Sequence, residues 1–473
     1  MRASRLATRL GAAGLVMLGL GGCFADKPFI AASPEIPQAY RAEAGAAAQA
    51  PTLWAKQFGS KELALLVEQA QEQNFDIAAA SARIVQAQGA AEAAGAGLYP
   101  QVQGSQSANR ALSPGTLRAQ DGPFRSSISN RFDLGLTASY TLDLFGRNRA
   151  LALSAQESAQ ASVYDRDVVA VATLASVANS YFLLLAAQDR LRLAKEDIRI
   201  AESVLEAIRE RLEVGTATAL DLAQQESVVA NQRASVPALE QLAQQTRNLL
   251  AVLVGRTPES MNLRGGSLDA LKLPTVRAGL PSQLLLQRPD IASAETKLAA
   301  QSANVAAARA AFLPSLTLTG TAGGASQTLQ NLLRPEALAA SLAQGLAAPI
   351  FTGGSLDGQL RAAEGRQVEA LELYRKSIVQ GLADVENALI AVQQSAIHER
   401  LQLAAVASAM RAYEITQVRL REGTVDVVTL LNIQLTLFQA QDQLTQVRLQ
   451  RFQATVSLYQ ALGGGWTRER AAP

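Results

Sequence analysis

The stretch that decides the fold is residues 174–216, LASVANSYFLLLAAQDRLRLAKEDIRIAESVLEAIRERLEVGT. Apolar residues recur in it at nearly alternating steps of three and four, the heptad spacing of a helix that buries one seam along its length. The stretch ends at Gly215-Thr216, and glycine suits the tight turn that follows a helix. We therefore expect a very long helix and then a tight turn. The seam consists of Leu174, Val177, Tyr181, Leu184, Ala187, Leu191, Ala194, Ile198, Ala201, Leu205, Ile208 and Leu212.

A second copy of this turn lies 208 residues further along the chain (419 − 211 = 208). Residues 211–216 read RLEVGT, and residues 419–424 read RLREGT. The seam of the second copy, from Leu382 to Leu420, is looser because Glu399 and Gln417 interrupt it. The chain is therefore expected to contain two repeats, each with a helix, two strands, a very long helix, a turn and a return helix.

The expected helix lengths suggest how each repeat packs. The long helix, about residues 148–213, has roughly 65 residues and would span ~100 Å. The return helix, about 218–254, has roughly 37, and the first helix, about 75–96, has roughly 22. Together the two shorter helices are nearly as long as the long helix. The corresponding helices of the second repeat, residues 290–311 and 426–462, have the same expected lengths. We predict that the shorter helices stack end to end along the long one.

The expected strands alternate strictly between apolar and polar residues. In residues 132–142, FDLGLTASYTL, every even position is apolar and every odd one is small or polar. Such a run suits a membrane strand of ~9–11 residues. Tyr99, Phe145, Phe312 and Phe351 fall where strands meet helices, as in an interfacial aromatic girdle. Four strands of a soluble sandwich are the alternative. The expected strands are about 99–110, 131–143, 313–324 and 340–350.

The strand count predicts an oligomer. Open sheet edges are not tolerated in lipid, and four strands are too few to close a membrane barrel. Two chains would supply eight strands and a filled interior, whereas three chains would supply twelve and leave a lumen. We therefore expect a homotrimer embedded in membrane lipid.

The N-terminus has the pattern of an export signal. Basic residues precede an apolar run, Leu10–Leu20, that is too short to span a bilayer. It leads to Leu20-Gly21-Gly22-Cys23, which resembles a bacterial lipobox. We expect residues 1–22 to be a lipoprotein signal peptide and Cys23, the single cysteine, to carry diacylglyceryl and acyl groups. Phe24 is not the aspartate of inner-membrane retention, which favours the outer membrane. The alternative is a chance cysteine beside an ordinary signal peptide.

Composition argues against an enzyme or a nucleic-acid-binding protein. The formal charge of +2 becomes −1 once the three arginines of residues 1–22 are removed (2 − 3 = −1), and no dense basic run is present. His398 is the single histidine, so no catalytic triad or clustered metal site is expected. The sequence lacks a P-loop, so we expect no cofactor, no metal and no nucleotide hydrolysis. Energy for transport would have to come from a partner.

Several motifs of the second repeat resemble one family. Residues 288–291 read RPDI and are followed by Ala294-Glu295, residues 310–314 read AAFLP, and residues 351–354 read FTGG. In these motifs the chain resembles the TolC-like outer-membrane efflux protein family, in its OprM/NodT-type lipoprotein branch, over nearly all of the mature chain. The resemblance implies a mainly α fold with a membrane β-barrel part. Duplicated helical hairpins would form a periplasmic α-barrel, and three chains a 12-stranded outer-membrane β-barrel.

The resemblance also implies a division of the chain. Besides the signal peptide it predicts an N-terminal equatorial segment, a first repeat with its hairpin at 148–254, and an inter-repeat equatorial segment. A second repeat with its hairpin at 358–462 and a C-terminal tail follow. The expected bounds are 23–74, 75–254, 255–289, 290–462 and 463–473.

The function implied by the resemblance is an exit duct in the outer membrane, extending into the periplasm. Such a duct passively conducts substrates that an inner-membrane RND-type transporter expels through a periplasmic adaptor protein. The hairpin tips dock the adaptor in the family, and they match Gly215, Thr216, Gly423 and Thr424. The alternative is that these glycines only form turns.

A periplasmic aperture is implied just after the second tip. Relatives of the OprM type carry there a bulky apolar residue and, four positions on, an aspartate. In this chain Val428 takes the apolar position and Asn432 the position of the aspartate. Three copies would form an apolar ring and an amide ring, with weaker cation selectivity than a carboxylate ring gives. The alternative is that Asn432 is a solvated helix residue.

Other classes of protein share parts of this pattern. A duct for type I protein secretion would have the same architecture. A non-conducting coiled-coil lipoprotein would explain the heptads alone. A periplasmic adaptor would have one hairpin flanked by lipoyl-like β segments, and the twofold duplication argues against it. Substrate selection is expected to lie largely in the pump.

Overall fold

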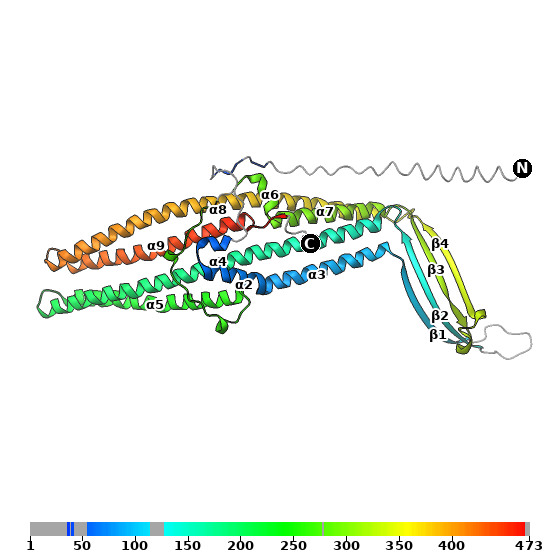
Figure 1. The fold of residues 1–473 in the computed structure, drawn as a ribbon, viewed down its shortest axis with the longest axis horizontal. Coiled ribbons are helices and arrows are strands. Elements are labelled where there is room, and N and C mark those ends of the chain that lie inside the picture. Colours follow the sequence, from blue (N-terminus) through cyan, green and yellow to red (C-terminus); the bar gives the residue numbers. More distant parts are fainter. Residues whose placement is uncertain (1–35, 38, 42–53, 114–126, 277–278, 469–473) are drawn as a thin grey trace, which may run out of the picture. The chain divides into compact units, whose positions relative to one another are not determined.

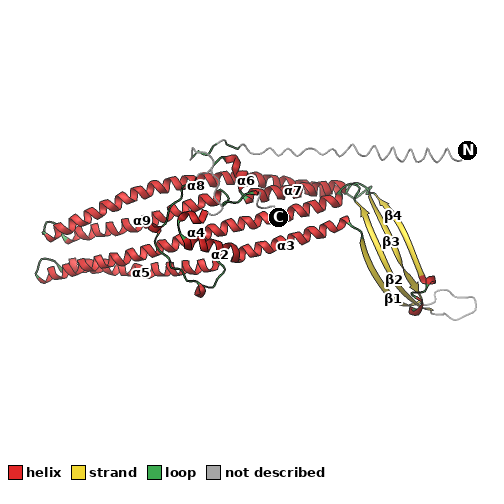
Figure 2. Cartoon of the chain, in the orientation of Figure 1, coloured by secondary structure: helices red, strands yellow, loops and turns green. Residues whose placement is uncertain are grey.

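The computed structural model describes residues 36–37, 39–41, 54–113, 127–276 and 279–468. The predicted signal peptide 1–22 and the lipid-attachment residue Cys23 lie outside these residues. The described chain is mainly helical, with four strands that form one sheet (Figure 1, Figure 2). The element order repeats, as predicted: helix, two strands, a very long helix and a return helix occur twice.

Two very long helices dominate the fold. Helices α4 (Arg147–Glu213) and α8 (Ser355–Arg421) each have 67 residues, and the return helices α5 (Ala219–Leu253) and α9 (Val427–Ala461) each have 35. The first helices of the repeats are α3 (Phe75–Gly95) and α7 (Pro289–Ala310). In each repeat the long helix packs against both the first and the return helix, and α4 also contacts α7 and α9 (Figure 1).

Most of the predicted seam of α4 is buried, and Leu174, Leu191, Ile198 and Leu212 are half-buried. Val177, Leu184 and Ala201 are 0% exposed, and Ile208 is 1% exposed. A stretch of α4 is apolar and long enough to cross a membrane, but half of it is buried inside the protein, as expected of a core helix.

The predicted seam of α8 is buried only in part. Val385 is 0% exposed, whereas Leu403 is 43% and Met410 41% exposed. Glu399, which interrupts this seam, accepts a hydrogen bond from Arg448 Nε at 3.2 Å and one from Arg451. These charged contacts join α8 to α9 at the level where the apolar seam is interrupted.

Each return helix ends where the first helix of its repeat begins, which confirms the predicted end-to-end stacking. The Asn74 side chain caps the start of α3, and its Nδ2 donates to the carbonyl of Leu253 at the end of α5, at 2.8 Å. In the second repeat Arg288 precedes α7, and its Nη1 donates to the carbonyl of Ala461 at the end of α9, at 3.1 Å. Leu253 and Ala461 differ by the repeat offset (461 − 253 = 208). Different side chains thus make the same helix-to-helix junction.

A glycine closes each junction. Gly255 and Gly463 have φ of +72° and +86°. A Cβ would lie 2.1 Å from the carbonyl oxygen of Gln73 at Gly255, and 1.8 Å from that of Gln287 at Gly463. Neither contact is sterically possible, so only glycine allows the two helix ends to approach this closely.

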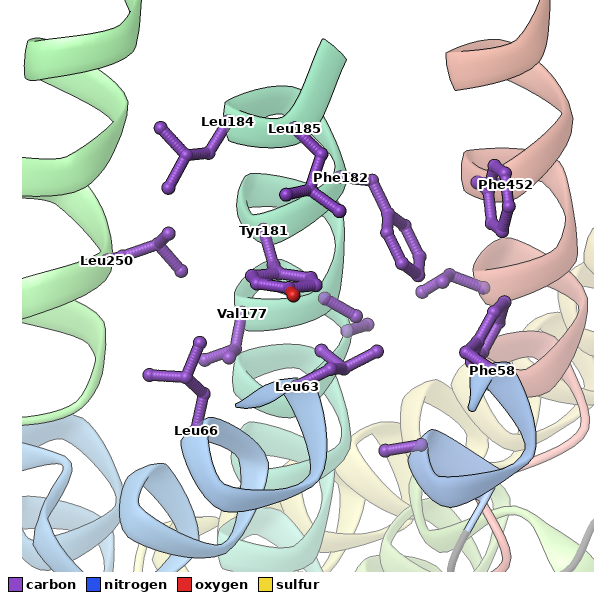
Figure 3. Packing of buried hydrophobic residues seen from close by; sticks show 14 of the residues in the cluster. Phe58, Leu63, Leu66, Val177, Tyr181, Phe182, Leu184, Leu185, Leu250 and Phe452 are labelled. Atoms are coloured by element: carbon purple, nitrogen blue, oxygen red, sulfur yellow. The ribbon is translucent and has the colours of Figure 1, made fainter. Parts of the chain in front are cut away.

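A core cluster surrounds the middle of α4. It includes Phe58 from a short 3₁₀ helix, Phe182 from α4 and Phe452 from α9, with ring centroids 5.0 Å (Phe58–Phe182) and 4.9 Å (Phe182–Phe452) apart (Figure 3). Leu63 and Leu66 of α2 (Lys61–Gln73) complete it. The sequence predicted an equatorial segment at 23–74 but no helix within it, so α2 is an addition.

The inter-repeat segment also packs on α4. Asp189 of α4 accepts hydrogen bonds from Leu268 N at 2.9 Å and from Ser267 Oγ at 3.1 Å. The segment consists of short turns of helix rather than one long element. The remaining short elements of the chain are η1 (Trp54–Phe58), η2 (Ala96–Leu98), η3 (Pro258–Ser260), η4 (Leu268–Ala270), η5 (Pro281–Gln283), α6 (Leu284–Gln287), η6 (Leu329–Asn331) and η7 (Pro335–Ala337).

The sheet is antiparallel, in the order β1-β2-β3-β4 (Figure 1). Its registers pair Gln106 with Leu134, Tyr140 with Leu318, and Leu318 with Gln344. β1 and β3 begin and end two or three residues later than predicted, β2 begins four residues earlier, and β4 is shifted about two residues towards the N-terminus. The strands are β1 (Gln101–Ser113), β2 (Ser127–Leu142), β3 (Ser315–Ser326) and β4 (Leu338–Ala347).

Candidate functional site at the sheet edges and the hairpin tips

The sheet has an apolar face and a polar face. Paired residues of an antiparallel sheet point to the same side, so the registers divide the side chains between two faces. On the polar face Thr141 and Thr317 are hydrogen-bonded at 3.2 Å, and Thr321 and Ser341 at 2.7 Å. The opposite face carries Val102, Leu134, Leu136, Leu142, Leu316, Leu318, Leu338, Leu342 and Leu346.

The apolar face is exposed in the single chain. Leu342 is 83% exposed and Leu346 62% exposed, and every residue of β4 is exposed. In the described part of the chain, β1 and β4 each pair with one strand only, so both edges of the sheet are open. Such a sheet requires an apolar medium on one face and further strands at its edges.

Aromatic residues mark the ends of the strands. Tyr99, just before β1, is 70% exposed, and Phe351, just after β4, is 90% exposed. Phe145, between β2 and α4, is 47% exposed. Large exposed aromatics at the end of an amphipathic strand are typical of a membrane interface.

The two hairpin tips have the same turn geometry. Gly215 and Gly423 have φ of +75° and +73°. The amide of Thr216 donates to the carbonyl of Arg211 at 2.8 Å, and the amide of Thr424 donates to that of Arg419 at 2.9 Å. With the bonds of the glycine amides to the carbonyls three residues back, these contacts form a Schellman motif at the end of each long helix. The same turn is therefore formed twice, by Gly215 and Thr216 and, 208 residues further along the chain, by Gly423 and Thr424.

Both return helices have a side-chain cap, and that of α5 is a reciprocal pair. Thr218 accepts from the amide of Asp221 at 3.2 Å, while the amide of Thr218 donates to the Asp221 carboxylate at 2.8 Å. At the second tip Asp426 accepts from the amide of Thr429 at 2.8 Å. Hydrogen bonds from Thr429 hold the pKa of Asp426 below its ordinary value, so this cap is lost as the pH falls through that lowered value.

The two tips pack against each other. Val204 and Ile208 of α4 share a buried cluster with Tyr413 of α8 and Leu430 of α9. The Arg211 side chain also donates a hydrogen bond to the Leu420 carbonyl of the other hairpin. Both tips therefore present their turns as one surface.

The predicted aperture residues lie on the outer face of α9. Val428 is 40% exposed and Asn432 is also exposed, whereas Leu430 is 1% and Leu431 8% exposed. The exposed pair is four residues apart and shares one side of the helix. Both side chains are therefore available to a neighbouring chain or to a lumen.

Arg288 belongs to a sequence motif quoted above, and the structure places it at a helix junction. Its guanidinium, which also contacts the end of α9, forms ion pairs with Asp290 at 2.6 Å and with Asp384 of α8 at 3.1 Å. The Arg288 side chain lies against Gly381 of α8. Asn74, its counterpart in the first repeat, was missed because an amide and a guanidinium share no sequence pattern.

The chain matches the sequence model of the family described as "Outer membrane efflux protein" over residues 66–256 and 280–464. It is 41% identical over 415 residues to "Pyoverdine export outer membrane protein OpmQ" of Pseudomonas putida, covering 87% of this chain and 88% of that protein. It is 32% identical over 456 residues to "Toluene efflux pump outer membrane protein TtgC" of Pseudomonas putida, covering 94% and 93%.

A solved structure shares the fold over most of the chain. The outer-membrane channel OprN matches with a TM-score of 0.83 and 27% identity, over 92% of this chain and 99% of that one. The two stacked hairpins and the amphipathic sheet described above are thus those of a known outer-membrane channel. The chain belongs to the outer membrane efflux protein family and is a protein of the outer membrane.

Proposed function

We propose that the protein is the outer-membrane exit duct of a tripartite efflux pump and that it conducts substrates passively. The observation that supports this most directly is the four-stranded sheet with one exposed apolar face and two open edges. Two hairpins with matched tips are part of the same chain. Such a chain needs lipid beside the sheet and a partner beyond the tips.

The working form is a homotrimer. Edge strands β1 and β4 of neighbouring chains would pair, and three chains would give twelve strands around a lumen. The polar face, with its threonine and serine hydroxyls, would then line the lumen, and the leucine face would contact lipid.

The paired hairpin tips dock a periplasmic adaptor that links the duct to an inner-membrane RND-type transporter. Gly215 and Gly423 have no atom within 4 Å of where a Cβ would stand, so the surface around both turns is open. The exposed turn residues Thr216 and Thr424 belong to the same surface.

The aperture is formed by α9 of each chain, with Val428 as the apolar ring and Asn432 as the amide ring. Support comes from the exposure of both residues beside a buried tip cluster. An amide ring lacks the fixed negative charge by which carboxylates attract cations.

A lipid on Cys23 anchors the N-terminus. Mass spectrometry of the mature N-terminus should show a diacylglyceryl and an acyl group on Cys23, and Cys23→Ser should remove both. An unmodified Cys23 would contradict the lipoprotein assignment.

The transported substrate is selected upstream of the duct. The relatives carry names that refer to pyoverdine and to toluene, although they share the fold with this chain. Because related proteins are named for such different compounds, we infer that selection is left to the transporter.

The experiment that tests the proposed function is conductance of the purified protein in a planar bilayer. The duct should give discrete conductance steps, and these should be larger or more frequent when the aperture residue Val428 is replaced by serine. Silent bilayers for both proteins, with insertion shown by protease protection, would favour a non-conducting lipoprotein instead.

A further inference from the structure

A cavity lies within the helical hairpins, away from the tips and from the core cluster. Helices α4, α5 and α9 line it, it is partly open to solvent, and its volume is about 320 Å³. This size falls at the lower end of the range for small-ligand pockets. The predicted duct function uses none of the residues that line it.

Asp197 lines this cavity, and no hydrogen bond or ion pair from the described residues reaches its side chain. Asp197 belongs to α4 and is only 5% exposed. Its Oδ1 is buried and accepts no hydrogen bond from any residue that the structure describes. A buried carboxylate of this kind is costly unless a cation or a donor reaches it.

The other charged groups of the cavity are already paired. Arg190 of α4 binds Asp442 of α9 through two hydrogen bonds, from Nε at 2.6 Å and from Nη2 at 3.1 Å. Asp442 also accepts from Gln446 Nε2 at 2.6 Å. The guanidinium is therefore committed to Asp442, and the lining residues carry a net charge of −1 that lies on Asp197 (1 − 2 = −1).

The rest of the wall is mostly apolar. Leu193 and Leu239 face the cavity from α4 and α5, and Leu435 and Phe438 from α9. The face of a phenyl ring attracts cations, and leucines accept an aliphatic chain. A dehydrated inorganic cation, by contrast, would bind only through the oxygen-bearing side chains and would leave the apolar part of the wall uncovered.

We propose that the cavity between α4, α5 and α9 binds a small organic cation, a primary ammonium on a short aliphatic chain, through the carboxylate of Asp197. The ammonium would pair with the carboxylate of Asp197, and the aliphatic chain would lie against the leucines and Phe438. The inference does not depend on the proposed duct function.

Binding should depend on pH. Burial, followed by the charges of Asp442 and Glu196, raises the pKa of Asp197 to about 7. The charged groups near it are Arg190 and Glu196 on α4 and Asp442 on α9, and the lining residues of α5 carry no charge. Because a bound cation favours the ionised form of the Asp197 carboxyl, binding at a pH below this pKa releases a proton from that group. Between pH 8 and pH 6 the ionised fraction falls from about 0.9 to about 0.1, while a primary amine stays charged.

The test is calorimetric titration of pentylammonium chloride into the full-length protein in detergent. We expect saturable binding at pH 8, about tenfold weaker binding at pH 6, and a loss of about tenfold or more in Asp197→Asn. Pentanol, the neutral analogue, should not saturate the site. Glu210→Gln removes an exposed carboxylate from the same helix and should leave the affinity within about twofold of the parent value.

A second variant tests the shape of the cavity without changing its charge. Ser235 lines the cavity from α5, and Ser235→Leu should narrow it and weaken binding. The proposal is overturned if the parent protein shows no saturable binding at pH 8. It is also overturned if Asp197→Asn or Ser235→Leu, shown to be folded by circular dichroism, binds as the parent does. Displacement of pentylammonium by an equal concentration of potassium chloride would assign the site to inorganic cations and overturn it as well.

Discussion

At the scale of single residues, two glycines with positive φ differ sharply in what surrounds them. Gly463 closes the junction of α9 with the start of α7, and Gly353 lies in the turn before α8. Both have positive φ, +86° and +59°. A Cβ at Gly463 would overlap the Gln287 carbonyl, whereas a Cβ at Gly353 would meet nothing within 4 Å. Alanine substitutions at these two positions therefore separate the cost of positive φ, which both share, from the cost of steric overlap, which only Gly463 has.

Gly463→Ala should therefore destabilise the protein more than Gly353→Ala. Alanine at positive φ costs about 1 kcal/mol at either position. At Gly463 the backbone must also move, which adds about 1–3 kcal/mol. The midpoint of thermal loss of the helical circular dichroism signal should fall clearly for Gly463→Ala and little for Gly353→Ala. Equal midpoints would mean that the junction is not tightly packed.

The amide at Asn432 leads to a prediction about selectivity. Asn432→Asp should raise the preference for cations, since three carboxylates would attract them directly. The effect should weaken at high salt, because exposed charges are screened over ~10 Å at 0.1 M. Reversal potentials in a salt gradient measure it, and Val428→Ser should raise resting conductance. If neither variant differs from the parent, the aperture lies elsewhere.

At the scale of elements, the sequence predicted regular periods well and irregular contacts poorly. The seam of α4 and the alternation in β2 gave helix and strand ranges close to those observed, because burial follows a fixed period in both. Helix α2 was missed, since its 13 residues pack through only a few buried positions, such as Leu63 and Leu66. The junction residues Asn74 and Arg288 were beyond prediction as a pair, because their partners are about 170 to 180 residues away.

The candidate site was predictable to a similar degree. The two turns were visible as a repeated glycine-threonine pair, and their identical hydrogen bonds explain why the pair repeats. The buried cluster between the tips was not visible, because Tyr413 and Val204 come from different repeats.

The two faces of β4 provide a direct test of the membrane side of the sheet. Leu342 lies on the apolar face, and its neighbour Ala343 lies on the polar face. Leu342→Arg should lower the amount of assembled protein in the outer membrane, because arginine facing lipid costs up to about 2–4 kcal/mol. Ala343→Arg should be tolerated. Immunoblots of membrane fractions measure this, and the reverse order would place lipid on the threonine face.

The hairpin tip allows docking to be separated from folding. Gly423→Asn keeps a residue that tolerates positive φ, whereas Gly423→Trp places a large side chain on the open turn surface. Export should be impaired by tryptophan and retained with asparagine, at equal levels in the membrane. Drug accumulation in whole cells is the measurement. Normal export by a well-expressed Gly423→Trp protein would argue against docking at this tip.

At the scale of the whole molecule, one chain has surfaces that it cannot satisfy alone. The sheet has two open edges and an exposed leucine face, and α8 exposes apolar residues such as Ile390, Leu401 and Ile415. Exposed apolar surface on both the sheet and the helices indicates that neighbouring chains cover it. The twofold repeat within the chain then becomes, in three chains, a ring of six similar units.

If neighbouring chains join edge to edge to close a duct, the purified complex must contain a fixed number of chains. The mass of the complex measures that number directly. Native mass spectrometry of the protein released from detergent should show a complex of three chains. The three-chain mass should persist in Cys23→Ser, because the barrel rather than the lipid holds the chains together. A complex of one chain would contradict the account, since four strands with two open edges cannot enclose a lumen.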